Sequence, residues 1–199
     1  MTICMVRHGQ SIWQVLPSDD LDSPLTPMGH RQSRLIGRWF SNRDSFHTDL
    51  RKRVRTIRVS PLKRALQTAA YVCEGLSLQA VTQANLLEAD FHVADHLPTR
   101  SMPLADPGTL ASEAYQRFKA QVKEAMSELM DAATEQEGEL LAVTHGAFIE
   151  TALRLVVGND TVRFPVSNTS LTVLRWEGGH WHLPLLNFTG HLPYGLRTS

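Results

Sequence analysis

Short apolar runs typical of buried β-strands alternate along this chain with longer segments whose apolar residues recur at helical spacing. The predicted strands of this alternating part are residues 2–6, 54–59 and 139–143. The predicted helices are residues 27–42, 61–74, 113–133 and 147–157. Strands that alternate with helices favour a mostly parallel sheet covered by helices on both faces. The pattern therefore predicts an α/β fold, a three-layer α/β/α sandwich.

Residues that cap or stop helices support two of these boundaries. Thr26 and Pro27 supply an N-cap and a first helical residue. Ser60 is the predicted N-cap of the helix that starts at Pro61, and Gly75 is the predicted end of that helix.

The last part of the chain changes from alternating units to a C-terminal β-hairpin. Residues 170–176 and 180–186 are predicted strands, and the sequence Glu177-Gly178-Gly179 between them is typical of a tight turn. The hairpin adds an edge to the sheet that could pair in a homodimer. With 199 residues and no repeat or linker, the chain is expected to form one domain over residues 1–199.

Composition excludes several classes of function. The 20 Lys and Arg residues balance the 20 Asp and Glu residues, so no general affinity for nucleic acid or for a charged membrane surface is expected. No apolar stretch reaches the roughly 18 residues of a membrane span, and no secretory signal is visible at the N-terminus. Cys4 and Cys73 are too few for a disulfide framework. A cytoplasmic protein is therefore expected.

Three short motifs carry an arginine or a histidine to the end of a predicted strand. Arg7 and His8 follow the first strand, Arg64 lies in the first turn of the helix after the second, and His145 follows the third. Ligands of open α/β sheets bind outside the carboxyl ends of the strands, so these side chains are expected to gather there. Two imidazoles and two guanidiniums at one place predict a site for a phosphoryl group.

Each of these side chains has a chemical task in phosphoryl transfer. His8 is the predicted nucleophile, because a neutral imidazole nitrogen can accept a phosphoryl group near neutral pH. Arg7 and Arg64 suit the charged oxygens, since a guanidinium stays protonated and binds phosphate through two parallel donors. Arg64 also lies in the first turn of a helix, where free N–H groups favour an anion. His145 would supply a further donor.

A leaving alkoxide needs a proton, and two carboxyl groups in the middle of the chain could supply it. Glu88 follows an apolar pair, and a partly desolvated carboxyl there can stay protonated long enough to act as a general acid. Asp90 is a second candidate. Both lie at the start of the proline-bearing loop of residues 89–110, which is expected to cover the site.

No step of this scheme requires a metal or a cofactor. His180 and His182 share one face of a predicted strand, which could suggest a metal site. No third ligand at suitable spacing accompanies them, so no metal site is predicted.

Several motifs of this chain match those of a known family. Residues 7–11 read Arg-His-Gly-Gln-Ser, and residues 60–69 read Ser-Pro-Leu-Lys-Arg-Ala-Leu-Gln-Thr-Ala. Residues 23–32, 144–146 and 187–192 add further similar segments. Together they resemble the histidine phosphatase superfamily, the phosphoglycerate-mutase-like clan, over nearly the whole chain.

The resemblance implies a phosphoglycerate-mutase-like fold and a phosphohistidine intermediate on His8. It also implies that Arg7, Arg64 and His145 complete the phosphate pocket and that Glu88 is the proton donor.

The resemblance further implies that Ser11, Gln14 and Gly146 contact the substrate. Gln14 stands where the family often has an asparagine and is longer by a methylene. Residues 90–96 replace a glycine and a Trp-x-Gly element of many members. Substrate preference is therefore expected to depend on this loop.

The predicted function is a metal-independent phosphatase that hydrolyses phosphomonoesters of small phosphorylated metabolites. A cofactor-dependent phosphoglycerate mutase is the alternative, although resemblance to mutases implies a longer chain with extra segments that close the site. A catalytically silent phospho-ligand binding protein on the same fold is a third hypothesis, and retention of the whole constellation argues against it. A protein phosphohistidine phosphatase is the fourth, since members of that branch resemble smaller, more open versions of the fold.

Overall fold

A computed structural model describes residues 1–16, 20–42, 53–135 and 138–199. Its described residues form one six-stranded sheet with the strand order β3-β2-β4-β1-β5-β6. The strands are β1 (Thr2–Arg7), β2 (Val54–Val59), β3 (Ala80–Thr82), β4 (Glu139–Thr144), β5 (Leu171–Glu177) and β6 (His180–Phe188). Three of the neighbouring pairs are parallel, and the pairs β1–β5 and β5–β6 are antiparallel. The predicted mostly parallel sheet with a C-terminal hairpin is confirmed.

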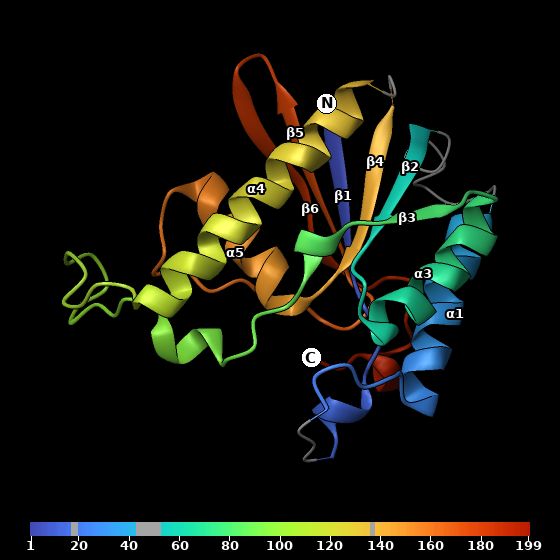
Figure 1. The fold of residues 1–199 in the computed structure, drawn as a ribbon, viewed down its shortest axis with the longest axis horizontal. Helices are drawn as coiled ribbons and strands as arrows, with labels where there is room; N and C mark the ends of the chain where they lie inside the picture. The colour runs from blue at the N-terminus through green and yellow to red at the C-terminus, as the bar shows by residue number, and fades with distance from the viewer. Residues whose placement is uncertain (17–19, 43–52, 136–137) are drawn as a thin grey trace.

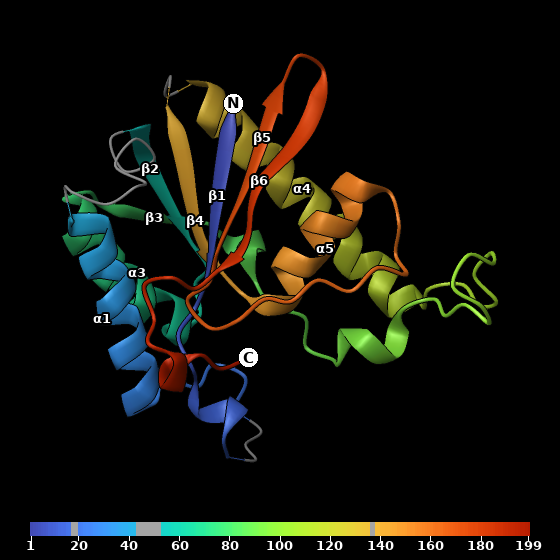
Figure 2. The same cartoon turned by 180° about the vertical axis from the view of Figure 1, so that it is seen from behind.

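Helices cover both faces of this sheet. They are α1 (Pro27–Ser41), α3 (Lys63–Leu76), α4 (Glu113–Glu135) and α5 (Gly146–Val157). Figures 1 and 2 show α1 and α3 together on one side of the sheet and α4 and α5 on the other. Each helix pair buries its apolar stripe against the sheet, and two separate clusters of apolar side chains result. The three-layer arrangement is that of the predicted α/β/α sandwich.

Both ends of helix α3 differ from those predicted, and the ends of the other predicted elements agree to within two residues. Helix α3 begins at Lys63 rather than at Pro61, and its N-cap is Leu62. The Ser60 hydroxyl lies 2.7 Å from Nε2 of His145 and accepts only a long bond, 3.4 Å, from the Leu62 amide. The helix also continues through Gly75 to Leu76, and the left-handed residue at its end is Ser77, with φ 57°. Strand β3 was not predicted, since its three residues show no apolar alternation.

The sheet places the ends of three strands side by side. Strand β4 lies between β1 and β2, and all three are parallel. Arg7 at the end of β1 is level with Thr144 at the end of β4, and Val59 of β2 is level with Val143. The residues that follow these strands therefore meet at one edge.

No helix among the described residues is long and apolar enough to cross a membrane.

Candidate active site

The three strand ends are joined by backbone hydrogen bonds that continue past the sheet. The His8 amide donates to the carbonyl of Thr144 at 2.9 Å, and the Ser60 amide donates to Val143 at 3.0 Å. The rings of His8 and His145 consequently lie with their centroids 5.1 Å apart. The structure thus brings together the two histidines that the sequence analysis selected.

The hydrogen bonds of His8 define which of its ring nitrogens is free to react. Nδ1 lies 2.6 Å from the carbonyl oxygen of Gly9, and a carbonyl can only accept, so Nδ1 carries the proton. On the other side, Nε–H of Arg64 donates to His8 Nε2 at 3.3 Å. Nε2 is therefore unprotonated, and its lone pair is the nucleophilic position of the ring.

Burial and charge keep His8 neutral. The residue is only 3% exposed, and this desolvation holds its pKa well below the usual value of a histidine. The neighbouring guanidiniums of Arg7 and Arg64 lower the pKa further, whereas the hydrogen bond to Gly9 acts in the opposite direction. At neutral pH the ring is consequently available as a nucleophile.

Two backbone carbonyls fix the arginines. Nη1 of Arg64 donates to the carbonyl of Leu21 at 2.6 Å, and Nη1 of Arg7 donates to the carbonyl of Val166. The Arg7 side chain also lies against Gly146, where a Cβ atom would come within 3.2 Å of Arg7 Nε. Glycine at position 146 therefore lets the guanidinium approach the start of α5.

His145 is completely buried and has one free nitrogen. Its Nε2 lies 2.7 Å from the hydroxyl of Ser60, and its Nδ1 has no hydrogen-bond partner. Desolvation, the largest cause, and the nearby charged groups hold the pKa of His145 well below its usual value. Nε of Arg7 is likewise buried without a partner. Buried polar atoms are normally satisfied, so two such nitrogens at one place indicate a site for an anionic ligand.

The Glu88 carboxyl lies at the start of helix α5. Its Oε2 accepts from the amide of Ala147 and its Oε1 from the amide of Phe148, each at 3.2 Å. His145, the N-cap residue of this helix, makes no side-chain cap. Glu88 therefore satisfies the free N–H groups of the first turn from another part of the chain.

Opposing effects act on the protonation of Glu88. Burial raises the pKa of its carboxyl, whereas the hydrogen bond from Ala147 and the charges of Arg7 and Arg64 lower it, and the net direction is upward. Asp90, the other candidate acid, is exposed. The geometry therefore favours Glu88 as the proton donor.

Ser11 and Gln14 hold each other and the loop that follows β1. Oε1 of Gln14 accepts from the Ser11 amide at 2.9 Å, and its Nε2 donates to Oδ1 of Asn168 at 3.2 Å. Direct substrate contacts of both residues stay predictions. Asn168 in turn donates through Nδ2 to the carbonyl of His8 at 3.1 Å. Residues 166–170 resemble a segment of the family, but the hydrogen bond of Asn168 to His8 was not predicted, because an asparagine followed by a threonine is also typical of an ordinary turn.

Two cavities of about 200 Å³ each flank the Glu88 carboxyl. One is lined on the Arg64 side by apolar residues that include Leu21 and Leu62. The other lies on the Arg7 side and is lined by Arg163, among other residues. Trp13, which is 48% exposed, borders both. Either cavity can accept the group attached to a phosphate that is bound between the arginines.

In the part of the chain that the structure describes, no group of three or more His, Cys, Asp or Glu side chains could hold a metal ion. His180 and His182 are exposed on β6. The side chains that gather at the strand ends are instead suited to binding an oxyanion directly.

Comparison with known proteins connects this geometry to one family. The family model of the histidine phosphatase superfamily (branch 1) matches residues 3–189. An uncharacterized phosphatase PhoE of Bacillus subtilis is 26% identical over 96% of both chains. A putative phosphoserine phosphatase 2 of Hydrogenobacter thermophilus is 28% identical and covers 94% of this chain and 95% of its own. The crystal structure of phosphoglycerate mutase from Bacillus anthracis superposes with a TM-score of 0.71 at 19% identity, over 96% and 94% of the two chains.

Proposed function

The chain belongs to the histidine phosphatase superfamily (branch 1) and is a phosphatase, and we propose that it hydrolyses small phosphomonoesters through a phosphohistidine on Nε2 of His8. The observation that carries this mechanism is the pairing of an unprotonated His8 Nε2 with unpartnered donors. Arg7 Nε and His145 Nδ1 are buried without partners beside the nucleophile and supply donors for the phosphoryl oxygens. The mechanism uses no metal and no cofactor.

The reaction has two displacement steps at phosphorus. In the first, His8 Nε2 forms a bond to phosphorus while the bond to the ester oxygen breaks, and Glu88 gives its proton to the leaving oxygen. In the second, the Glu88 carboxylate takes a proton from water as the water oxygen attacks phosphorus and the P–N bond breaks. Inorganic phosphate leaves, and both His8 and Glu88 regain their starting protonation states.

The size of the two cavities that border Arg64 and Arg7 supports a small substrate. Each measures about 200 Å³, whereas sites for drug-sized ligands measure about 300–1,000 Å³. A phosphorylated metabolite of a few carbon atoms fits this space. The protein has no charge excess that would favour nucleic acid or an anionic membrane as a partner. Two free cysteines lead us to propose the cytoplasm as its compartment.

Trapping of the intermediate tests the mechanism. The protein is mixed with p-nitrophenyl phosphate, quenched under alkaline conditions that preserve phosphoramidates, and examined by intact mass and ³¹P NMR. We expect turnover and a phosphoramidate signal in the wild type and in a His182→Ala control, and neither in His8→Ala. A folded His8→Ala variant that still released nitrophenol at the wild-type rate would reject the mechanism.

A further inference from the structure

The segment that carries Glu88 has little regular structure of its own. It consists of the short 3₁₀ turn Ala84–Leu86 followed by Leu87 and Glu88 in a loop. Three successive carbonyls of this segment accept hydrogen bonds from side chains. The Asn85 and Leu87 carbonyls accept from Nε2 of Gln121, at 3.1 and 3.3 Å, and the Leu86 carbonyl accepts from the Thr144 hydroxyl at 2.9 Å. The path of the chain toward Glu88 is thus set by side chains from two other elements.

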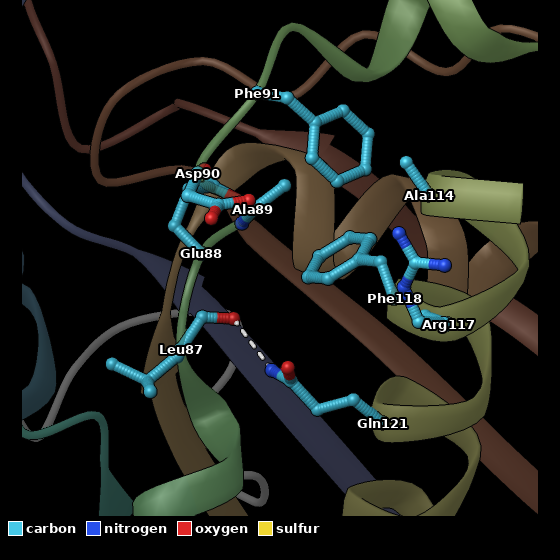
Figure 3. A pocket seen from close by; sticks show the side chains of 9 residues that line it. All are labelled: Leu87, Glu88, Ala89, Asp90, Phe91, Ala114, Arg117, Phe118 and Gln121. Carbon is cyan, nitrogen blue, oxygen red and sulfur yellow. Dashed lines mark hydrogen bonds between the residues drawn. The ribbon is translucent and has the colours of Figure 1, made fainter.

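Gln121 provides two of these three bonds with a single amide group. Its two N–H hydrogens suffice for one bond to each carbonyl on either side of Leu86. Gln121 lies in the middle of α4, and Figure 3 shows its side chain reaching from that helix to the Leu87 carbonyl. One glutamine therefore connects the longest helix to the segment that presents the catalytic carboxyl.

A cavity lies between the Glu88 segment and α4, next to the hydrogen bonds of Gln121. The space measures about 390 Å³ and separates Glu88, Asp90 and Phe91 from the side chains of Arg117 and other residues of α4. Figure 3 shows Gln121 at the end of this space nearest Leu87. Phe91 packs edge-to-face on Phe118 with ring centroids 6.2 Å apart, and Leu86 is buried in the core, so packing holds the segment on either side of Leu87 and Glu88. At the Leu87 end of the cavity the directed hydrogen bonds of Gln121 add to this packing.

The position of the Leu87 carbonyl is transmitted directly to Glu88. The carbonyl of Leu87 and the amide of Glu88 belong to one planar peptide unit. The hydrogen bond from Gln121 to this carbonyl therefore sets the orientation of the peptide plane from which the Glu88 side chain extends. The Glu88 carboxyl must then reach the amides of Ala147 and Phe148 and the leaving oxygen of a substrate. Misplacement by about 1 Å is enough to lower a rate by about 100-fold.

We propose that Gln121 is a positioning residue for the general acid of this phosphatase. It holds the Leu87–Glu88 peptide against α4 so that the Glu88 carboxyl points at the leaving oxygen. The inference rests on the proposed function, in which Glu88 donates the proton. Because the helix is anchored by buried apolar residues such as Phe118 and Val122, Gln121 is not needed to hold α4 itself.

A comparison of two substrates separates positioning from general structural support. Ethyl phosphate has a poor leaving group that needs protonation, whereas nitrophenolate leaves with little help from an acid. Gln121→Met keeps a long, flexible side chain but removes both N–H donors. We expect kcat/KM, which reports only the first displacement and not the common hydrolysis of the phosphoenzyme, to fall about tenfold or more for ethyl phosphate in this variant and much less for p-nitrophenyl phosphate.

Two further variants of α4 complete the experiment. Gln116→Met makes the same change at an exposed position of the helix and should behave as the wild type. Gln121→Lys restores N–H donors on a side chain of similar reach and should recover part of the ethyl phosphate activity. Equal losses of kcat/KM for both substrates in Gln121→Met, or no loss for either, would overturn the proposal.

Measurement of Glu88→Gln in parallel distinguishes failure of the proposal for Gln121 from failure of the proposed function. A selective loss of ethyl phosphate activity in Glu88→Gln with no such loss in Gln121→Met would reject Gln121 alone. Equal losses of kcat/KM for the two substrates in Glu88→Gln would reject the role of Glu88 as proton donor, and the role of Gln121 with it.

Discussion

Burial sets the protonation of three histidines, namely His8, His145 and His191. In each case desolvation is the largest cause that lowers the pKa, and for His191 the value falls to about 4. In the unfolded chain these rings take up protons near pH 6.5. The stability that they contribute is therefore complete above that pH and is lost as the pH falls toward the pKa of the folded protein.

Replacement of His191 tests this linkage without touching the nucleophile. The His191 ring packs near Trp39 and Phe188, so His191→Phe keeps an aromatic ring and removes the titrating group. Between pH 7 and pH 4.5 the free energy of unfolding should fall by about 2 kcal/mol less in His191→Phe than in the wild type. Urea unfolding at the two pH values measures this difference. An identical pH dependence in His191→Phe and in the wild type would contradict the low pKa of His191.

The raised pKa of Glu88 predicts an alkaline limb in the activity. A general acid must be protonated, so kcat/KM for ethyl phosphate should decline as the pH rises through the pKa of Glu88. Glu88→Gln should abolish this limb together with most of the rate, and Asp90→Asn should retain it. The pH profiles of the three proteins measure the effect. Loss of the limb in Asp90→Asn alone would transfer the acid role to Asp90.

The sequence predicted the side chains at this site better than it predicted their supports. His8 and His145 could be placed together because parallel strands end at one edge of a sheet. The carbonyls of Leu21 and Val166, which hold the two arginines, could not be predicted, since any residue type presents the same carbonyl. The hydrogen bonds from Gln121 could not be predicted for the same reason, because their acceptors are also backbone carbonyls.

Helices α1 and α3 approach each other closely through two glycines. A Cβ atom on Gly37 of α1 would lie 2.3 Å from the carbonyl oxygen of Tyr71, and one on Gly75 of α3 would lie 2.1 Å from that of Gly37. Contacts this short force the backbones apart. The sequence analysis interpreted Gly75 as a helix stop, because close packing of two backbones leaves no local signal.

Gly37→Ala tests this contact between elements. The added methyl group should lower the free energy of unfolding by about 1–3 kcal/mol, since it displaces the two helices against a well-packed core. Urea unfolding gives the change, and activity per folded molecule should stay near the wild-type value because the site lies at the strand ends. Gly195→Ala is the matched control, with no atom within 4 Å of the added carbon. Equal midpoints for the two variants would contradict the close approach.

Strand and helix lengths were predictable where burial was continuous. All six residues of β4 are buried, and helix α4 begins at Glu113 as predicted and ends two residues beyond the predicted limit. Strand β3, by contrast, has two exposed residues out of three and forms because the edge of β2 is available for pairing. An edge of this kind exists only once the sheet has assembled, so a local pattern cannot predict it.

Segments from opposite ends of the chain converge beneath His8. The side-chain oxygen of Gln32 accepts from the Gln10 amide at 2.8 Å, and Gln32 Nε2 donates to the Thr198 hydroxyl at 2.8 Å. That hydroxyl donates to Oδ1 of Asn168 at 2.8 Å, and Asn168 donates to the His8 carbonyl. Figure 2 shows the C-terminus beside the loop that follows β1. Two of these contacts, Gln32 with Thr198 and Asn168 with His8, join residues more than 150 positions apart and were not predictable from any local motif.

Thr198→Val tests whether this network supports the nucleophile. Valine has the shape of threonine but leaves Gln32 Nε2 and Asn168 Oδ1 each with one bond fewer, so the free energy of unfolding should fall by about 1–2 kcal/mol. Because attack by His8 is common to all substrates, kcat should fall by a similar factor for ethyl phosphate and p-nitrophenyl phosphate. Thr198→Ser retains the hydroxyl and should behave as the wild type in both measurements. Identical kinetics of the two variants would show that the C-terminal segment does not act on His8, whereas a loss confined to ethyl phosphate would connect it to Glu88 instead.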